Sequence, residues 1–139
     1  MTLFISGIEK TWRSMYKTAL HYLMITVLCI LFGAVYESFS HGVFSYYMLY
    51  AFCVPLFGGV IPFLLIIYFR GAVPGKTAFN LYHSGIAALT VGCFFQGVLE
   101  IYGTTNRLIL IYWGVGAIFL LSGIVVYFAG KQNVIRKER

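Results

Sequence analysis

Two glutamates and one histidine are the side chains in this chain best suited to bind a cation or carry a proton. Glu37 and Glu100 each end a long apolar stretch, and His41 follows Glu37 by four residues. Carboxylate oxygens and an imidazole nitrogen can titrate or ligate a divalent metal, although the spacing selects no particular metal. We therefore predict a ligand- or ion-binding site at these residues. The alternative is that they are ordinary water-facing residues at helix ends.

Gln96 extends this candidate site toward the membrane interior. It precedes Glu100 by four residues, so the two side chains share a face if the segment is helical. An amide in hydrocarbon needs hydrogen-bond partners, and we expect Glu100 or Thr26 to supply one. A plain interhelical hydrogen bond is the alternative to a role in binding.

His21 and His83 suggest a second kind of chemistry. They occupy matching depths in two different apolar stretches, and two imidazoles in a helical bundle can ligate one b-type haem. His83 shares its helix face with small residues such as Ala87, whereas His21 shares its face with bulky residues such as Leu28. Haem-based electron transfer is therefore an alternative hypothesis, and interfacial histidines are the simpler interpretation.

The candidate residues recur in the two halves of the chain. The segment 32–37 matches 95–100 at Phe, Val and Glu, and 66–71 resembles 125–130. His21 lies 16 residues before Glu37, and His83 lies 17 before Glu100. An internal repeat of a two-helix hairpin would give both halves the same orientation, with a pseudo-axis along the membrane normal.

The elements that must position these residues are transmembrane helices. Hydrophobic residues make up 60% of the chain and charged residues 10%, whereas a soluble domain carries about 25% charged residues. Four apolar stretches reach the ~20 residues that a helix needs to cross the bilayer. These stretches are Thr18–Tyr36, Val43–Phe69, Ala78–Leu99 and Leu108–Ala129. We predict an all-α integral membrane protein, an up-down-up-down bundle of four transmembrane helices.

The positive charges predict the orientation. Nine of the ten Lys and Arg residues flank the same side of the four stretches, and only Arg107 lies on the other side. The positive-inside rule then places both termini in the cytoplasm of a multi-pass cell-membrane protein. The net charge of +6 is explained by this topology and by anionic lipid headgroups, so no nucleic-acid partner is expected.

These features divide the chain into five parts. Residues 1–17 form a basic segment, expected either as an amphipathic surface helix or as an extension of the first span. Residues 18–69 are the first two-helix repeat, 70–77 a cytoplasmic loop, 78–129 the second repeat and 130–139 a basic cytoplasmic tail.

The second span is expected to be irregular. Pro55 and Pro62 each remove a backbone donor, and Gly58 and Gly59 lie between them. A kink or an unwound segment is expected there, serving either as a hinge or as a static bend.

Small residues predict which helix faces point inward. On each of the first and third spans we expect one stripe of residues to face the inside of the bundle. On the fourth span we expect three glycines to let a neighbouring helix approach closely. Cys29, Cys53 and Cys93 are expected to be buried free thiols. The two stripes are Thr26, Cys29, Gly33 and Glu37, and Ser84, Ala88, Gly92 and Gln96; the glycines are Gly114, Gly116 and Gly123.

Together these patterns favour a small polytopic binding, transport or accessory subunit. Its partners would be the lipid bilayer and either further copies of itself or a larger membrane complex. A purely structural accessory subunit is the other alternative. The chain contains no Asp, no nucleophile motif and no phosphate-binding loop, so an enzyme is less favoured.

Overall fold

Three long helices dominate the computed structural model, which describes residues 2–69 and 75–138. They are α1 (Thr2–Phe39), α5 (Lys76–Ile101) and α6 (Ile109–Glu138). Each contains a stretch long and apolar enough to cross a membrane, and these stretches are Trp12–Phe39, Lys76–Ile101 and Ile109–Lys131. Apolar side chains cover their outward faces, so the chain has the character of a multi-pass membrane protein.

The remaining apolar stretch is not one helix. It consists of α2 (Tyr46–Leu49), α3 (Cys53–Pro55), the π-helix η1 (Leu56–Val60) and α4 (Ile61–Tyr68). Its longest continuous part, Cys53–Tyr68, is shorter than 18 residues, whereas a perpendicular span requires ~20. The irregularity expected between Pro55 and Pro62 is thus present as a π-helix, and a further break separates α2 from α3.

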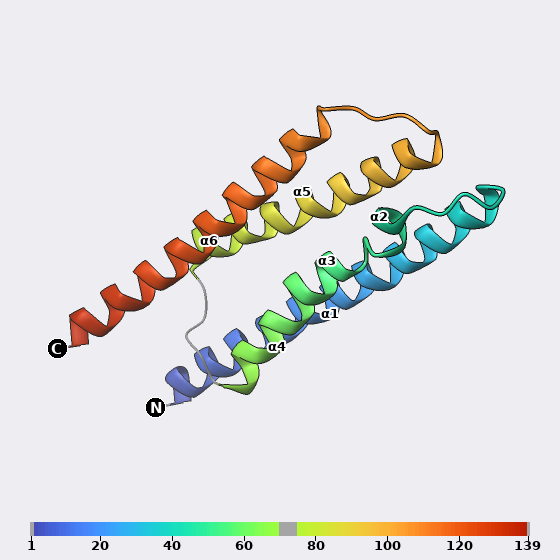
Figure 1. The fold of residues 1–139 in the computed structure, drawn as a ribbon. Helices are drawn as coiled ribbons and strands as arrows, with labels where there is room; N and C mark the ends of the chain where they lie inside the picture. Colours follow the sequence, from blue (N-terminus) through green and yellow to red (C-terminus); the bar gives the residue numbers. More distant parts are fainter. Residues whose placement is uncertain (1, 70–74, 139) are drawn as a thin grey trace.

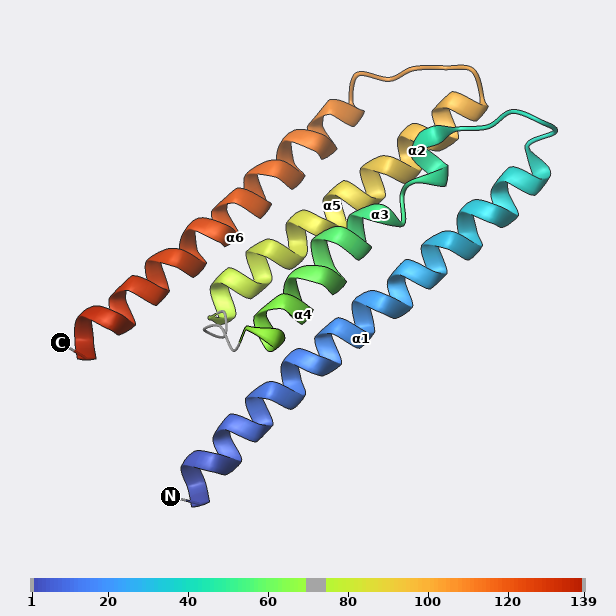
Figure 2. The same ribbon diagram turned by 60° about the horizontal axis from the view of Figure 1, so that its bottom comes forward.

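The chain reverses direction at each connection, and its two ends lie at the same end of the molecule (Figure 1). The segment α2–α4 lies between α1 and α5, while α6 packs mainly on α5 (Figure 2). We call the end with the two termini the terminal end, and the end with the connections 40–45 and 102–108 the loop end. The two halves of the predicted repeat differ in form, because α6 is continuous whereas the segment α2–α4 is interrupted.

Helix α1 runs without a break through the boundary expected near residue 17. The basic N-terminal segment therefore continues the first span as one helix. This continuity agrees with the simpler of the two expectations for residues 1–17, and the faces of its first eleven residues lie outside the described side chains.

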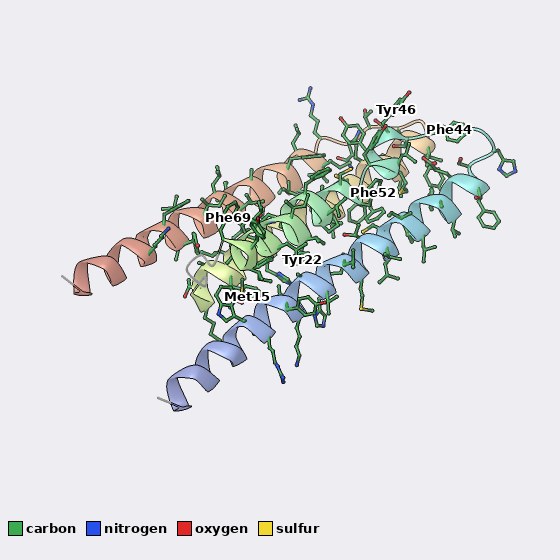
Figure 3. All side chains as sticks on the ribbon, turned by 90° about the horizontal axis from the view of Figure 1, so that it is seen from below. Met15, Tyr22, Phe44, Tyr46, Phe52 and Phe69 are labelled. Carbon is green, nitrogen blue, oxygen red and sulfur yellow. The ribbon has the colours of Figure 1, made fainter. Side chains whose placement is uncertain are left out.

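The core at the terminal end is built from α1, η1, α4 and α5. It comprises Met15, Ala19, Tyr22, Val60, Phe63 and Ile86. Figure 3 shows Tyr22 between α1 and the segment that contains α4. The ring of Tyr22 stacks on Phe63, with 5.6 Å between ring centroids. It also packs against Gly59, where no Cβ would fit, so the glycine of the π-helix permits this close contact.

The inward stripe predicted for the first span is confirmed, because Thr26, Cys29 and Gly33 are all buried. The stripe predicted for the third span is only partly right. Ser84 is exposed, and α5 instead buries Ile86, Thr90, Cys93 and Gly97 on the side that faces α1 and α2. Gly92 is buried as expected, but it faces Tyr112 of α6.

Glycines bring α5 and α6 into backbone contact. A Cβ added to Gly85 would lie 2.7 Å from the Leu120 amide nitrogen, and one added to Gly123 would lie 2.7 Å from the Tyr82 amide nitrogen. Close approach was also expected at Gly116 and Gly114. Gly116 contacts Leu89, whereas Gly114 has open space around it, so the expectation at Gly114 is wrong.

Candidate functional site

The short helix α2 fills the space between α1 and α5 near the loop end. Its Met48 is 1% exposed. A Cβ added to Gly33 of α1 would lie 3.2 Å from the Met48 carbonyl oxygen, and one added to Gly97 of α5 would lie 2.8 Å from the Met48 Cβ. Glycines on both long helices allow α2 to approach this closely, and the requirement is stricter at Gly97 than at Gly33. Its position determines what surrounds the two glutamates.

Ser45 connects α2 to one of these glutamates. The Ser45 hydroxyl donates a hydrogen bond of 2.7 Å to Oε2 of Glu100, and the Ser45 Oγ accepts a hydrogen bond from the Met48 amide in α2. Ser45 is 1% exposed. A serine at this position is a common helix N-cap, and here it also holds the Glu100 carboxyl group against the bundle.

Glu37 lies one helical turn beyond Gly33, as Glu100 lies about one turn beyond Gly97. Both glutamates are therefore next to the segment that contains α2, and both are half-buried. Oε1 of Glu37 is fully buried and has no hydrogen-bond partner among the described residues. Nearby, the side chains of Tyr36 and Tyr102 lie close to each other at the loop end. The two glutamates expected to form a site thus lie on different helices, each close to the segment that contains α2.

His41 and Gln96 do not join the glutamates. Helix α1 ends at Phe39, so His41 does not share a face with Glu37. His41 has a φ of 56° and is exposed, and its Nδ1–H donates to the Phe39 carbonyl over 2.8 Å. The Gln96 amide is half-buried and makes no hydrogen bond with another described residue, and Thr26 instead donates to the Tyr22 carbonyl. Within the described parts of the chain, no three metal-binding side chains gather.

A second polar cluster lies at the terminal end, and it joins His83 to Tyr22, which the sequence analysis did not single out. A hydrogen bond of 2.5 Å joins the Tyr22 hydroxyl to Nδ1 of His83, and the His83 ring stacks on Phe79 at 5.2 Å between centroids. His21, next to Tyr22, is exposed, and its Nδ1–H donates to the Lys17 carbonyl over 2.6 Å. Only the matching depths of the two histidines signalled this cluster. Nothing in the pattern identified Tyr22.

The π-helix is also joined to α5 by a tyrosine. The Tyr82 hydroxyl donates a hydrogen bond of 2.5 Å to the Gly58 carbonyl. In a regular α-helix that carbonyl would accept the amide of the residue four positions later, which here is Pro62 and has no N–H. Tyr82 therefore supplies the donor that the proline removes, and the candidate hinge is held to α5 at this point.

Two apolar hollows accompany these clusters. One, of about 310 Å³, lies between α4, α5 and α6 at the terminal end and includes Phe63, Phe79 and Tyr82 in its wall. The other is a groove of about 710 Å³ between α1 and α5, lined by residues such as Phe32 and Phe94. All three cysteines are free thiols; Cys29 and Cys93 are buried as expected, whereas Cys53 is only half-buried.

The fold and its apolar surface define an all-helical membrane protein with three helices long enough to span the bilayer. Comparison with protein-family models, with curated proteins and with solved structures finds no match for this chain.

Proposed function

We propose that this chain is a small polytopic membrane protein that binds a small cation between α1, α2 and α5 at the loop end. The observation that carries the proposal is the buried Oε1 atom of Glu37, which has no partner among the described residues. A carboxylate oxygen removed from water without a hydrogen bond is costly unless a cation or a proton compensates it.

The surroundings of Glu37 support a cation in particular. The Glu100 carboxyl group and the Ser45 hydroxyl, which are hydrogen-bonded to each other, come from the neighbouring elements. Carboxylate, hydroxyl and backbone carbonyl oxygens are the ligands that hard cations prefer. Paired or interior-facing ionisable residues in membrane proteins commonly mark ion pathways.

The wider architecture completes the proposal. Segment 43–69 is taken as a fourth, interrupted crossing, since irregular backbone is tolerated at membrane depth where it is buried in protein. The distribution of Lys and Arg residues along the chain supports the proposal that both termini lie in the cytoplasm of a cell-membrane protein. The hairpin repeat accounts for the matching positions of Glu37 and Glu100. Four helices enclose little volume alone, so we propose that the chain works as an oligomer or within a larger membrane complex.

Cation binding should be visible at individual glutamates, because the chain has only four and no aspartate. With glutamate labelled by ¹³C at the side-chain carboxyl, the purified protein should give four assignable signals. Adding Na⁺ or Ca²⁺ at constant pH should shift the Glu37 and Glu100 signals saturably, because a bound cation polarises both carboxylates.

Glu9 and Glu138 provide internal controls, and choline chloride controls for ionic strength. In the Glu37→Gln variant, the Glu100 signal should no longer respond. Equal shifts at all four glutamates would indicate general screening and contradict the site. No response to either ion would favour a structural accessory subunit.

Haem binding by His21 and His83 is a second candidate, and one specific observation favours it. Both imidazoles engage Nδ1 in a hydrogen bond and leave Nε2 without a partner among the described residues. With Nδ1–H donating to the Lys17 carbonyl and to the Tyr22 oxygen, each Nε2 keeps the lone pair that binds iron. Such outer hydrogen bonds are typical of metal-ligating histidines.

A reduced-minus-oxidised visible spectrum tests this candidate. Protein expressed with ample haem precursor should show Soret and α bands that disappear in both His21→Ala and His83→Ala. His41→Ala is the matched control, because the third histidine of the chain is exposed at the opposite end. A featureless spectrum, or bands that survive both substitutions, would contradict haem ligation.

A further inference from the structure

The hollow between α4, α5 and α6 has an almost entirely apolar wall at the terminal end of the molecule. Its volume is about 310 Å³, and its wall combines aromatic and aliphatic side chains from three elements. These include Pro62 and Phe63 from α4, Ala78 and Phe79 from α5, and Ile124 and Phe128 from α6. A hydrocarbon chain suits such a wall, whereas a free polar solute would lose its hydration there without compensation.

Two lysines lie just beyond this hollow, one on each helix of the α5–α6 pair. Lys131 follows Ile124 by seven residues and Tyr127 by four, so it shares their face of α6. Lys76 begins α5, three residues before Phe79. Both lysines are exposed.

The glycine contacts between α5 and α6 determine where the two lysines lie relative to each other along the helix axes. Gly123 of α6 contacts Tyr82 of α5, and Gly116 of α6 contacts Leu89 of α5. Because the two helices are antiparallel, the numbers of facing residues add up to the same value, 205, in both pairs. In this antiparallel register Lys76 lies opposite position 129. That position is two residues from Lys131, which is about 3 Å along a helix axis. The backbones of the two lysines therefore lie at nearly the same level along the helix pair, just beyond the residues that line the hollow.

We propose that this site binds one anionic phospholipid, with an acyl chain in the hollow and the headgroup phosphate on Lys76 and Lys131. The apolar wall selects a tail and the paired lysines select a negative headgroup. Basic residues beside crevices between transmembrane helices are a known basis for recognising anionic lipids. This proposal is independent of the cation site, which lies at the opposite end.

Native mass spectrometry of the full chain in detergent can measure this selectivity. Phosphatidylglycerol and phosphatidylcholine with the same acyl chains would be added in equal amounts. We expect roughly tenfold or more preference for phosphatidylglycerol, since each lysine contributes a share of the electrostatic attraction. The double variant Lys76→Gln/Lys131→Gln should bind the two lipids about equally.

Matched variants separate the two parts of the site. Arg13→Gln/Lys17→Gln removes two charges from α1 and should leave the preference unchanged. Ile124→Trp fills the hollow and should reduce phosphatidylglycerol binding, whereas Ile118→Trp, at a position 65% exposed on the same helix, should not. The thermal unfolding of each variant in detergent would show that it is folded.

Three outcomes would overturn the proposal. Equal binding of the two lipids by the unchanged chain would remove the headgroup site. An equal loss of selectivity in the Arg13/Lys17 variant would show that charge acts generally. Unchanged phosphatidylglycerol binding by a folded Ile124→Trp variant would show that the acyl chain lies elsewhere.

Discussion

Alanine at Gly123 should destabilise the protein, whereas alanine at Gly114 should not. At Gly123 the new Cβ would lie 2.7 Å from the Tyr82 amide nitrogen and 3.0 Å from its Cα. These are backbone atoms that cannot rotate away, so α5 and α6 must separate. Overpacking of this kind costs about 1–3 kcal/mol of unfolding free energy. Reversible unfolding in mixed detergent–SDS micelles, followed by tryptophan fluorescence, measures the change.

Gly114 is the matched control on the same helix, because nothing lies within 4 Å of its added Cβ. There alanine should stabilise the helix by about 0.5–1 kcal/mol, the ordinary gain over glycine in a helix. The same substitution should therefore have opposite signs at two positions nine residues apart. Equal effects at both would show that α5 and α6 are not in backbone contact at Gly123.

The Tyr82→Phe variant should lose about 1–2 kcal/mol of unfolding free energy, near the upper end for a hydrogen bond within a membrane. The Gly58 carbonyl would lose the Tyr82 donor, and Pro62 cannot replace it, since it has no N–H. Infrared spectra of a chain with ¹³C=¹⁸O at Gly58 should show the carbonyl band moving to higher frequency.

Pro62→Ala makes the test specific, because it restores an N–H that can reach the Gly58 carbonyl. In that background Tyr82→Phe should cost little, giving a coupling energy of about 1 kcal/mol in a double-mutant cycle. Additive losses would mean that Tyr82 stabilises the protein through its ring, which packs against Phe63, and not through its hydroxyl.

Helix faces were predictable where small residues repeat along a long apolar helix. Thr26, Cys29 and Gly33 are buried as expected, since their four- and three-residue spacing defines a single face. On α5 the small residues cover two faces, because Gly85 and Gly92 contact α6 while Gly97 contacts α2. A single stripe chosen from the sequence could not represent both contacts, and Ser84 was placed wrongly for that reason.

The candidate sites were predictable only in part. The positions of Glu37 and Glu100 at the helix ends followed from the apolar stretches that precede them. The partnership of Ser45 with Glu100 joins residues 55 positions apart and depends on α2 entering between two glycines. The hydrogen bond between Tyr22 and His83 spans 61 positions and has no local pattern. Contrary to the prediction, His41 does not share a face with Glu37, because α1 ends at Phe39. The residue at which a helix ends is hard to predict from an apolar sequence.

The lengths of α1 and α6 have a consequence for how the molecule meets water. The two helices contain 38 and 30 residues, or about 57 and 45 Å at 1.5 Å per residue, against about 30 Å of hydrocarbon. Both overshoot the bilayer, and both chain ends lie at the same end (Figure 1). The apolar stretches Trp12–Phe39 and Ile109–Lys131 both reach the loop end, so we expect most of the excess to extend outside the hydrocarbon at the terminal end. Limited proteolysis of the protein in vesicles should therefore cut more readily at the terminal end than at the connections 40–45 and 102–108.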